Sequence, residues 1–234
     1  MKCKFLILSL AVIVTSCAPE TKDGNNQSIF DNISQVLETD SETTVDLTKH
    51  GIANNKNNVL GGLMVGDLAP DIELEDERGT LISLDKKLEE GPVLLVFYRA
   101  DWCSIRRRHL AEFQDKINDI RDTGVASVLA ISPQKQEYSL QLHTDNNYTF
   151  PILYDKSHQT MKDYKVFFHV TDKYNQKITK SKGDPIEFRN GNTEPVMPVP
   201  ATYVIGQDKK IKYVHYDPNY RVRADIDEAL KSIM

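Results

Sequence analysis

The stretch "PVLLVFYRADWCSIRRRHL", residues 92–110, joins an apolar run to a charged segment through a short turn. Residues 92–100 are almost continuously apolar, which is typical of a central strand buried on both faces. After Cys103, apolar residues recur every three or four positions, which is the period of a helix with one buried face. These residues are Leu110, Phe113, Ile117 and Ile120. The sequence therefore predicts a buried strand, a turn and a helix, with Cys103 where the helix begins.

Strands and helices alternate along the rest of the chain. The expected elements are a hairpin over 71–84, a buried strand over 125–133, a helix over 134–146, a short strand over 150–155, a short helix over 157–165, a hairpin over 201–217 and a closing helix within 223–234. This order predicts an α/β domain of three layers, with a central mixed sheet flanked by helices. Residues 169–195 are long and polar, and we expect them to form an inserted loop.

The N-terminus has the layout of a secretory signal, with lysines followed by an apolar run and small residues. The run is shorter than the ~20 residues that a membrane-spanning helix needs. Residues 14–17, Val-Thr-Ser-Cys, resemble a bacterial lipobox, in which Cys17 is acylated. The alternative is an ordinary signal with a chance cysteine. The lipobox predicts a protein of the bacterial cell envelope, lipid-anchored to a membrane, with its soluble domain outside the cytoplasm.

The expected organisation follows from this. Residues 1–16 are a lipoprotein signal peptide, and residues 17–62 are a polar tether that carries a short amphipathic helix within 27–38. Residues 63–234 form the main domain, with the insertion near 169–195.

Composition excludes some partners and cofactors. The 234-residue chain has a formal net charge of −5, and its one dense basic run is too short to predict nucleic-acid binding. The six histidines are scattered, and no cysteine or histidine spacing resembles a metal motif. No glycine-rich phosphate loop is present, so we expect neither a metal nor another cofactor.

Cysteine usage singles out one thiol. Of three cysteines, Cys3 leaves with the signal and Cys17 is consumed by the lipid, so Cys103 is the free thiol of the mature chain. An unpaired cysteine in an exported protein is a thiol that pairs with a partner, a reactive thiol, or a small buried apolar residue. At the start of a helix, free N–H groups and the helix dipole favour the thiolate form, which is the nucleophile.

Three stretches carry a family resemblance: "VGDLAPDIEL" (65–74), "PVLLVFYRADWC" (92–103) and "PVPATYVIGQDKKIKYVHYDPNYRVRADIDEAL" (198–230). They resemble the peroxiredoxin-like branch of the alkyl-hydroperoxide-reductase/thiol-specific-antioxidant (AhpC/TSA) family. The resemblance implies a thioredoxin-like fold. It also implies a substrate pocket, which we expect at Tyr98, Trp102, Val199 and Pro200.

Pro200 matches the proline that is usually cis in that fold and that brings the backbone of Val199 close to the thiol. An ordinary turn proline is the alternative. Members of the branch commonly have Phe-Tyr-Arg-Gly-x-Trp-Cys-Pro-x-Cys, whereas here Ser104 replaces the proline and Arg106 replaces the second cysteine. The nucleophile of thioredoxins aligns with Cys103, and the peroxidatic cysteine of peroxiredoxins aligns with Arg106.

The arginines depart from the usual helix pattern, because cations in the first turns cost roughly 0.3–1 kcal/mol each. Helical spacing places Arg106 and Arg107 beside Cys103. Arg106 also lies at the top of the buried stripe, where it can pair with the thiolate or with a sulfenate. Arg99, which matches the arginine of the family motif, is the second candidate. The alternative for Arg106 is an arginine that covers the core with its aliphatic stem.

The neighbouring polar residues have simpler interpretations. Arg107 and Arg108 are expected to be solvated surface charges, and Asp101 can neutralise one of the arginines. His109 is six residues from Cys103 and lies off its helical face, so we expect it at the surface.

Three functions compete. The first is an exported one-cysteine peroxidase that reduces hydrogen peroxide or alkyl hydroperoxides with an external thiol donor, such as a thioredoxin-like protein. The second is a monothiol thioredoxin-like thiol-disulfide oxidoreductase, which can form a mixed disulfide but cannot resolve it alone. The third is a degenerate, non-enzymatic thioredoxin-fold lipoprotein.

Overall fold

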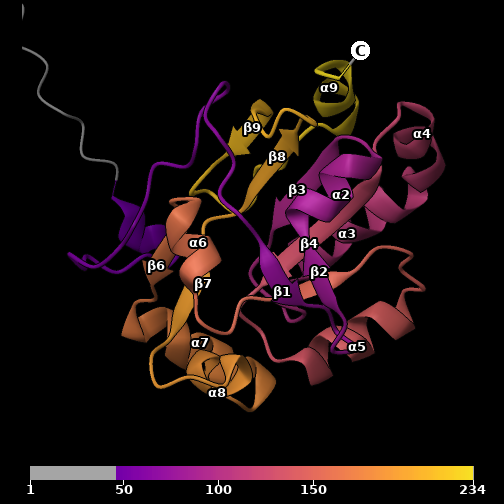
Figure 1. Ribbon diagram of the computed structural model, residues 1–234. Coiled ribbons are helices and arrows are strands. Elements are labelled where there is room, and N and C mark those ends of the chain that lie inside the picture. The colour runs from indigo at the N-terminus through magenta and orange to yellow at the C-terminus, as the bar shows by residue number, and fades with distance from the viewer. Residues whose placement is uncertain (1–45, 234) are drawn as a thin grey trace, which may run out of the picture. The chain divides into compact units, whose positions relative to one another are not determined.

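The computed structural model describes residues 46–233, which are built around a five-stranded sheet (Figure 1). The sheet order is β5-β4-β3-β8-β9. Its strands are β3 (Val93–Phe97), β4 (Ser127–Ser132), β5 (Ile152–Tyr154), β8 (Ala201–Ile205) and β9 (Ile211–Tyr216). β3, β4 and β5 run parallel, whereas β8 is antiparallel to both β3 and β9. This confirms the predicted α/β domain with a mixed sheet.

Helices and two small sheets complete the domain. The remaining elements are η1 (Leu47–His50), β1 (Glu73–Glu75), β2 (Leu81–Ser83), α2 (Leu84–Glu90), α3 (Ser104–Asp115), α4 (Ile117–Asp122), α5 (Gln136–Asp145), α6 (Gln159–Asp163), β6 (Phe167–His169), α7 (Asp172–Lys182), α8 (Ile186–Asn190), β7 (Val196–Pro198) and α9 (Ile226–Lys231). β1 pairs with β2 and β6 with β7, both antiparallel. The predicted hairpins over 71–84 and 201–217 are confirmed.

The three layers follow from strand alternation in β3, because successive side chains point to opposite faces of a sheet. Val93, Leu95 and Phe97 join the core that also contains residues of α2, α6 and α7. Leu94 and Val96 join a second core, which α3, α4, α5 and α9 cover. Both faces of the central strand are therefore buried, as its continuous apolar sequence predicts.

The segment 169–195 differs from its expected form, because it contains the helices α7 and α8 rather than a long loop (Figure 1). α7 begins at a cap in which the Thr171 hydroxyl accepts a hydrogen bond from the N–H of Tyr174, and it ends at Gly183. Such caps satisfy backbone groups that a polar segment otherwise leaves to water. Ile178 and Ile186 anchor the two helices in the core.

Residues 46–62, which the sequence assigns to the tether, pack against the domain. Ile52 is buried in the core and forms an isolated β-bridge with Val170, and Val59 forms another with Phe167. The buried face of the chain thus begins before residue 63. The predicted signal peptide, Cys17 and the helix within 27–38 lie outside the described residues. Within residues 46–233 no helix is both long and apolar enough to cross a membrane.

The Val199–Pro200 bond corrects one expectation. Every peptide bond of the described residues is trans, so Pro200 is not the cis proline that the resemblance implies. Trans is the ordinary state of a peptide bond. The N–H of Val199 donates to the carbonyl of Val166 (2.7 Å), which fixes the chain entering β8.

Candidate redox site

Cys103 lies at the N-cap of α3, directly after the turn that leaves β3. Its backbone is extended (φ −85°, ψ 99°), and its carbonyl accepts hydrogen bonds from the N–H groups of Arg106 (2.9 Å) and Arg107 (3.0 Å). The residue is only 6% exposed. Cys103 therefore combines the predicted position at a helix start with nearly complete burial.

Arg99 lies fully buried next to this turn. Its Nη1 donates to the Tyr174 hydroxyl (3.0 Å), and its Nη2 donates to the His50 carbonyl (3.0 Å). The guanidinium also lies 4.2 Å from the centre of the Tyr220 ring, a distance at which a cation is attracted to the π face. Its Nε has no hydrogen-bond partner. The structure thus holds a positive charge in an aromatic cage.

Arg106 provides a second buried cation. Its Nη2 donates to the carbonyls of Tyr220 (3.0 Å) and Val222 (3.3 Å), and its Nη1 lies 3.3 Å from His109 Nδ1. The side chain is 2% exposed, so it does not merely cover the core with its stem. Its carbonyl partners carry no charge, and the anionic groups that favour the cation are Cys103 and Asp217.

Both arginines stay protonated near neutral pH. Burial lowers the pKa of Arg106 to about 10, while the nearby Cys103 acts in the opposite direction. Burial also lowers the pKa of Arg99, again against the effects of Tyr174 and Cys103. Both guanidinium groups lie close enough to Cys103 to interact with it electrostatically. Cations placed in this way stabilise negative charge that develops during a reaction at the sulfur.

The insertion closes over the turn that carries Cys103. Tyr174 of α7 bonds Arg99 and packs against Trp102, with 6.4 Å between ring centres. Arg189 of α8 donates to both carboxylate oxygens of Asp101, each at 2.9 Å. Asp101 is therefore neutralised by an arginine of the insertion rather than by the neighbouring basic run.

The other expected pocket residues divide between the two cores. Trp102 and Val199 belong to the same core as Cys103. Tyr98 is fully buried in the other core, because alternation along β3 points it to the opposite face of the sheet. Pro200 is buried, and its carbonyl accepts a hydrogen bond from the N–H of Asp217 (3.5 Å). Trp102 and Val199 therefore lie in the same hydrophobic core as Cys103, whereas Tyr98 does not.

His109 corrects another expectation, since it is buried rather than at the surface. Its ring packs on Phe113 (4.8 Å between centres) and faces Arg106. Burial, reinforced by Arg106, lowers the pKa of His109 to about 3, so the ring is neutral at physiological pH. Arg107 and Arg108 are exposed, as expected.

Four residues of this site were missed from the sequence: His50, Tyr174, Arg189 and Tyr220. The sequence did contain a signal for α7, because Thr171 is a residue type that commonly caps the start of a helix and Gly183 is one that commonly ends it. No local signal points to the pairing of Tyr174 with Arg99, because the two residues are 75 positions apart.

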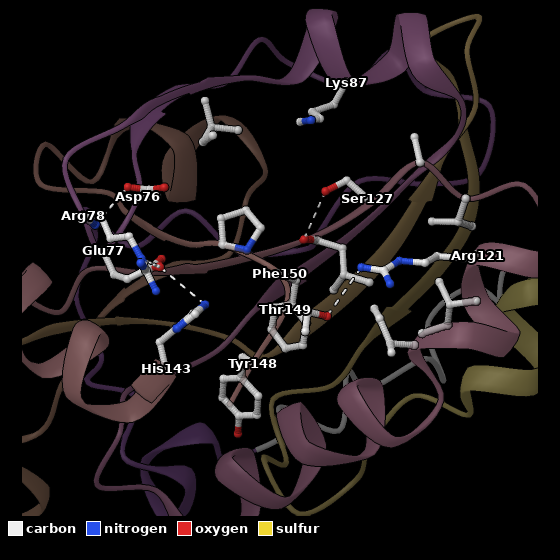
Figure 2. Close-up of a pocket in the computed structure, with 17 residues that line it drawn as sticks. Asp76, Glu77, Arg78, Lys87, Arg121, Ser127, His143, Tyr148, Thr149 and Phe150 are labelled. Atoms are coloured by element: carbon white, nitrogen blue, oxygen red, sulfur yellow. Dashed lines mark hydrogen bonds and ion pairs between the residues drawn. The ribbon is translucent and has the colours of Figure 1, made fainter. Parts of the chain in front are cut away.

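A separate cavity of about 440 Å³ shares no residue with this site (Figure 2). Figure 2 shows that the acidic residues of this cavity interact with neighbouring protein groups. The carboxylate of Glu77 accepts from the N–H of Ile152 (2.9 Å) and lies 3.4 Å from the His143 ring nitrogen, and Asp76 accepts from two backbone N–H groups. Within residues 46–233 no group of three or more histidine, cysteine or acidic residues is arranged to hold a metal ion.

The mixed sheet, its two helical layers and the cysteine at the start of α3 define a thioredoxin-like fold. Residues 65–214 match the family model of the AhpC/TSA family, and the chain belongs to this family. Family membership supports a thiol-based peroxidase or redox role for the chain.

Curated relatives and solved structures agree with this assignment. A putative chloroplastic peroxiredoxin Q of Oryza sativa subsp. indica is 25% identical over 174 residues, which are 74% of this chain and 68% of the relative. The peroxidoxin BcpB of Mycobacterium tuberculosis superposes with a TM-score of 0.56 at 22% identity, covering 73% of this chain and 96% of that chain. A yeast mitochondrial 1-Cys peroxiredoxin gives a TM-score of 0.53 at 16% identity, covering 73% and 75%. At these identities the solved structures support the fold.

Proposed function

We propose that the protein is a one-cysteine thiol peroxidase that reduces hydrogen peroxide or alkyl hydroperoxides. The observation that carries this proposal is the pair of buried cations, Arg99 and Arg106, beside a cysteine at the start of a helix. A cysteine thiolate flanked by cations is a nucleophile for a small electrophile. The AhpC/TSA fold around it supports peroxide as that electrophile.

The reaction begins when the Cys103 thiolate attacks the terminal oxygen of the peroxide. An S–O bond forms, the O–O bond breaks, and the alkoxide or hydroxide leaves with a proton as an alcohol or water. The sulfur is oxidised by two electrons to a sulfenate, and the peroxide is reduced. Negative charge develops on the leaving oxygen, and the two guanidinium groups stabilise it.

Regeneration requires thiols from outside the described domain, because Cys103 is the one cysteine in residues 46–233. A first thiol attacks the sulfenic sulfur, which releases water and leaves a mixed disulfide. A second thiol attacks that disulfide, which releases the oxidised donor and restores Cys103.

The burial of Cys103 distinguishes this proposal from a protein disulfide oxidoreductase. Cys103 is only 6% exposed, and side chains of α7 and α8 contact the turn that carries it, so a protein disulfide has to displace more of the protein than a small peroxide does. The observation therefore favours peroxidase chemistry over exchange with folded proteins.

The test is peroxide consumption by the purified protein with dithiothreitol as reductant. We expect turnover with wild-type protein, trapping of the sulfenate by dimedone on Cys103, and neither signal with Cys103→Ser. Turnover no faster than that of Cys103→Ser would show that the cysteine is not peroxidatic.

We propose also that the protein is exported and lipid-anchored in a bacterial envelope, on the strength of residues 1–17. Cys17 would carry the lipid, and the soluble domain would lie outside the cytoplasm. Mass spectrometry of the mature N-terminus tests this. We expect an acylated Cys17 at the first position, and an intact N-terminus that starts at Met1 would contradict it.

A further inference from the structure

Cleavage of a peroxide releases an oxygen that needs a proton. Hydrogen peroxide releases hydroxide, whose conjugate acid has a pKa of about 15.7, so an acid placed beside the leaving oxygen speeds the cleavage. Arginine stays protonated in proteins, so Arg99 and Arg106 stabilise charge on that oxygen without supplying a proton. The proton donor has to be another group.

The hydroxyl of Tyr174 is fixed through its oxygen and free through its hydrogen. The oxygen accepts a hydrogen bond from Arg99 Nη1 at 3.0 Å. A phenol both accepts and donates, and among residues 46–233 no group accepts the hydrogen of this hydroxyl. The hydrogen is therefore left for a bound molecule.

Tyr174 also lies beside the thiol. Its half-buried ring packs against Trp102, the residue before Cys103, with 6.4 Å between ring centres, and against the core that contains Cys103. Burial raises the pKa of Tyr174, Arg99 acts in the opposite direction, and a charge on Cys103 adds to the increase. The hydroxyl thus lies within electrostatic reach of Cys103 and stays protonated at neutral pH, as a proton donor must.

Tyr220 is the other tyrosine next to Arg99, but it presents its ring rather than its oxygen. The guanidinium lies 4.2 Å from the centre of the Tyr220 ring. In the part of the chain that the structure describes, no hydrogen bond fixes the Tyr220 hydroxyl, whereas Arg99 fixes that of Tyr174. The geometry therefore favours Tyr174 as the donor.

Resting on the proposed peroxidase function, we propose that Tyr174 is the acid that protonates the leaving oxygen of the peroxide, with Arg99 holding its hydroxyl in place. The Cys103 thiolate forms the S–O bond, the O–O bond breaks, and the Tyr174 proton passes to the leaving oxygen, which departs as water or an alcohol. The attacked oxygen keeps its hydrogen as a sulfenic acid. This hydrogen then passes to the Tyr174 oxygen, which restores the phenol and leaves the sulfenate. Arg99 Nη1, already bonded to that oxygen, stabilises the transient phenolate.

Two peroxides separate proton donation from any other role of Tyr174. Hydrogen peroxide releases hydroxide and needs the proton. Peracetic acid, freed of hydrogen peroxide with catalase, releases acetate, the anion of a carboxylic acid with a pKa of about 4–5, and does not need it. The rate of sulfenate formation in the full chain is followed with each at pH 7 by stopped-flow fluorescence of Trp102, the one tryptophan of the sequence. Trapping with dimedone and intact mass spectrometry identify the product.

The variant is Tyr174→Phe, which keeps the ring and its packing against Trp102. We expect its rate with hydrogen peroxide to fall by about 100-fold, as loss of a general acid implies, and its rate with peracetic acid by less than about tenfold. The ratio of the two rates therefore falls about tenfold or more. The matched control is Tyr213→Phe, because Tyr213 is on β9 and its charged neighbours are Glu228 and Asp225. The control should leave both rates unchanged.

Equal slowing with both peroxides would show that Tyr174 only holds Arg99, and it would overturn the proton transfer, as would no slowing at all. A ratio that falls in Tyr220→Phe but not in Tyr174→Phe would assign the proton to the other tyrosine. These results leave the peroxidase intact, because the wild-type sulfenate has formed. If the wild-type protein forms no sulfenate with either peroxide, the peroxidase itself is rejected, and the inference with it.

Discussion

At the scale of single residues, the site depends on a cation that helix formation alone disfavours. Arg106 lies in the first turn of α3, where the helix dipole opposes a positive charge. Its burial costs further free energy, which the Tyr220 and Val222 carbonyls offset in part. Both effects disfavour a cation at this position. We infer that Arg106 is there because it stabilises negative charge that develops on the Cys103 sulfur.

We therefore predict that Arg106→Gln slows the reaction of Cys103 with peroxide by about tenfold or more. The measurement is the rate at which Cys103 is oxidised by hydrogen peroxide. Arg106→Lys, which retains the charge but loses part of the hydrogen bonding, should slow this reaction much less. Equal losses in the two variants would assign the effect to packing rather than to charge.

His109 gives a prediction about acid stability. Burial lowers its pKa to about 3, whereas an unfolded histidine titrates near 6.5. Below about pH 6.5 this histidine is protonated in the unfolded state but stays neutral in the folded state. The free energy of unfolding therefore falls as the pH drops from about 6.5 toward 3. Between pH 7 and pH 5 this amounts to about 2 kcal/mol.

The measurement is the free energy of unfolding in urea at pH 7 and pH 5. His109→Asn keeps an acceptor for Arg106 but does not titrate, so it should lose about 2 kcal/mol less than wild type over this interval. His158, whose pKa burial lowers to about 4, acts in the same direction as His109. Asp155 acts in the opposite direction, since burial raises its pKa to about 6. Both groups are present in each protein, so equal losses in wild type and variant would show that His109 does not titrate as described.

At the scale of elements, α7 and α8 act as a cover that two long-range contacts hold in place. We predict that Arg189→Gln, which removes the pair with Asp101, lowers the free energy of local opening by about 1–2 kcal/mol. Modification of Cys103 by a bulky maleimide should then accelerate about tenfold. Modification by the small iodoacetamide should change less, because it needs a smaller opening.

The control for this experiment is Asp184→Asn. Asp184 is only partly buried and lies 3.7 Å from the same guanidinium, so its loss should change the maleimide rate by no more than about twofold. A maleimide rate that Arg189→Gln leaves unchanged would show that α8 does not limit access.

The same elements show what the sequence reveals and what it does not. β3 and α3 were predictable because their apolar residues repeat with the period of each element, and the position of Cys103 between them followed. α7 and α8 were not predicted, because Ile178 and Ile186 are single apolar residues in a polar segment and show no helical period. The two residues become buried only in the folded domain, where they join the core that also contains residues of β6 and β7. Tyr98 was misassigned for a different reason, since alternation along β3 places it on the other face of the sheet.

Buried polar partners were the least predictable part of the site. Helical spacing did indicate that Arg106 lies beside Cys103, but not that His109 turns inward to face the guanidinium. The partners of Arg99 come from residues 50 and 174, and no sequence pattern connects them with residue 99. Such contacts depend on the packing of distant elements, which a local period does not encode.

At the scale of the whole molecule, the chain before residue 63 completes both the core and the site. Ile52 is buried, the His50 carbonyl accepts from Arg99, and Gly51 makes room for α7. A side chain at Gly51 would place its Cβ 2.8 Å from the Tyr174 ring, in a backbone conformation (φ +86°) that favours glycine. A chain truncated to residues 63–234 should therefore be less stable than one truncated to residues 46–234.

The expected loss is the burial of Ile52, about 1.5–3 kcal/mol, plus about 1–3 kcal/mol for the unpaired Arg99 donor. For a domain of this size that lowers the thermal midpoint by roughly 5–20 °C. Differential scanning calorimetry of the two truncated chains measures it, and the peroxide reaction rate of Cys103 should fall together with the midpoint because Arg99 is no longer fixed. Equal thermal midpoints of the two truncated chains would mean that residues 46–62 contact the domain without stabilising it. Equal peroxide reaction rates would mean that Tyr174 and Tyr220 are sufficient to hold Arg99 in place.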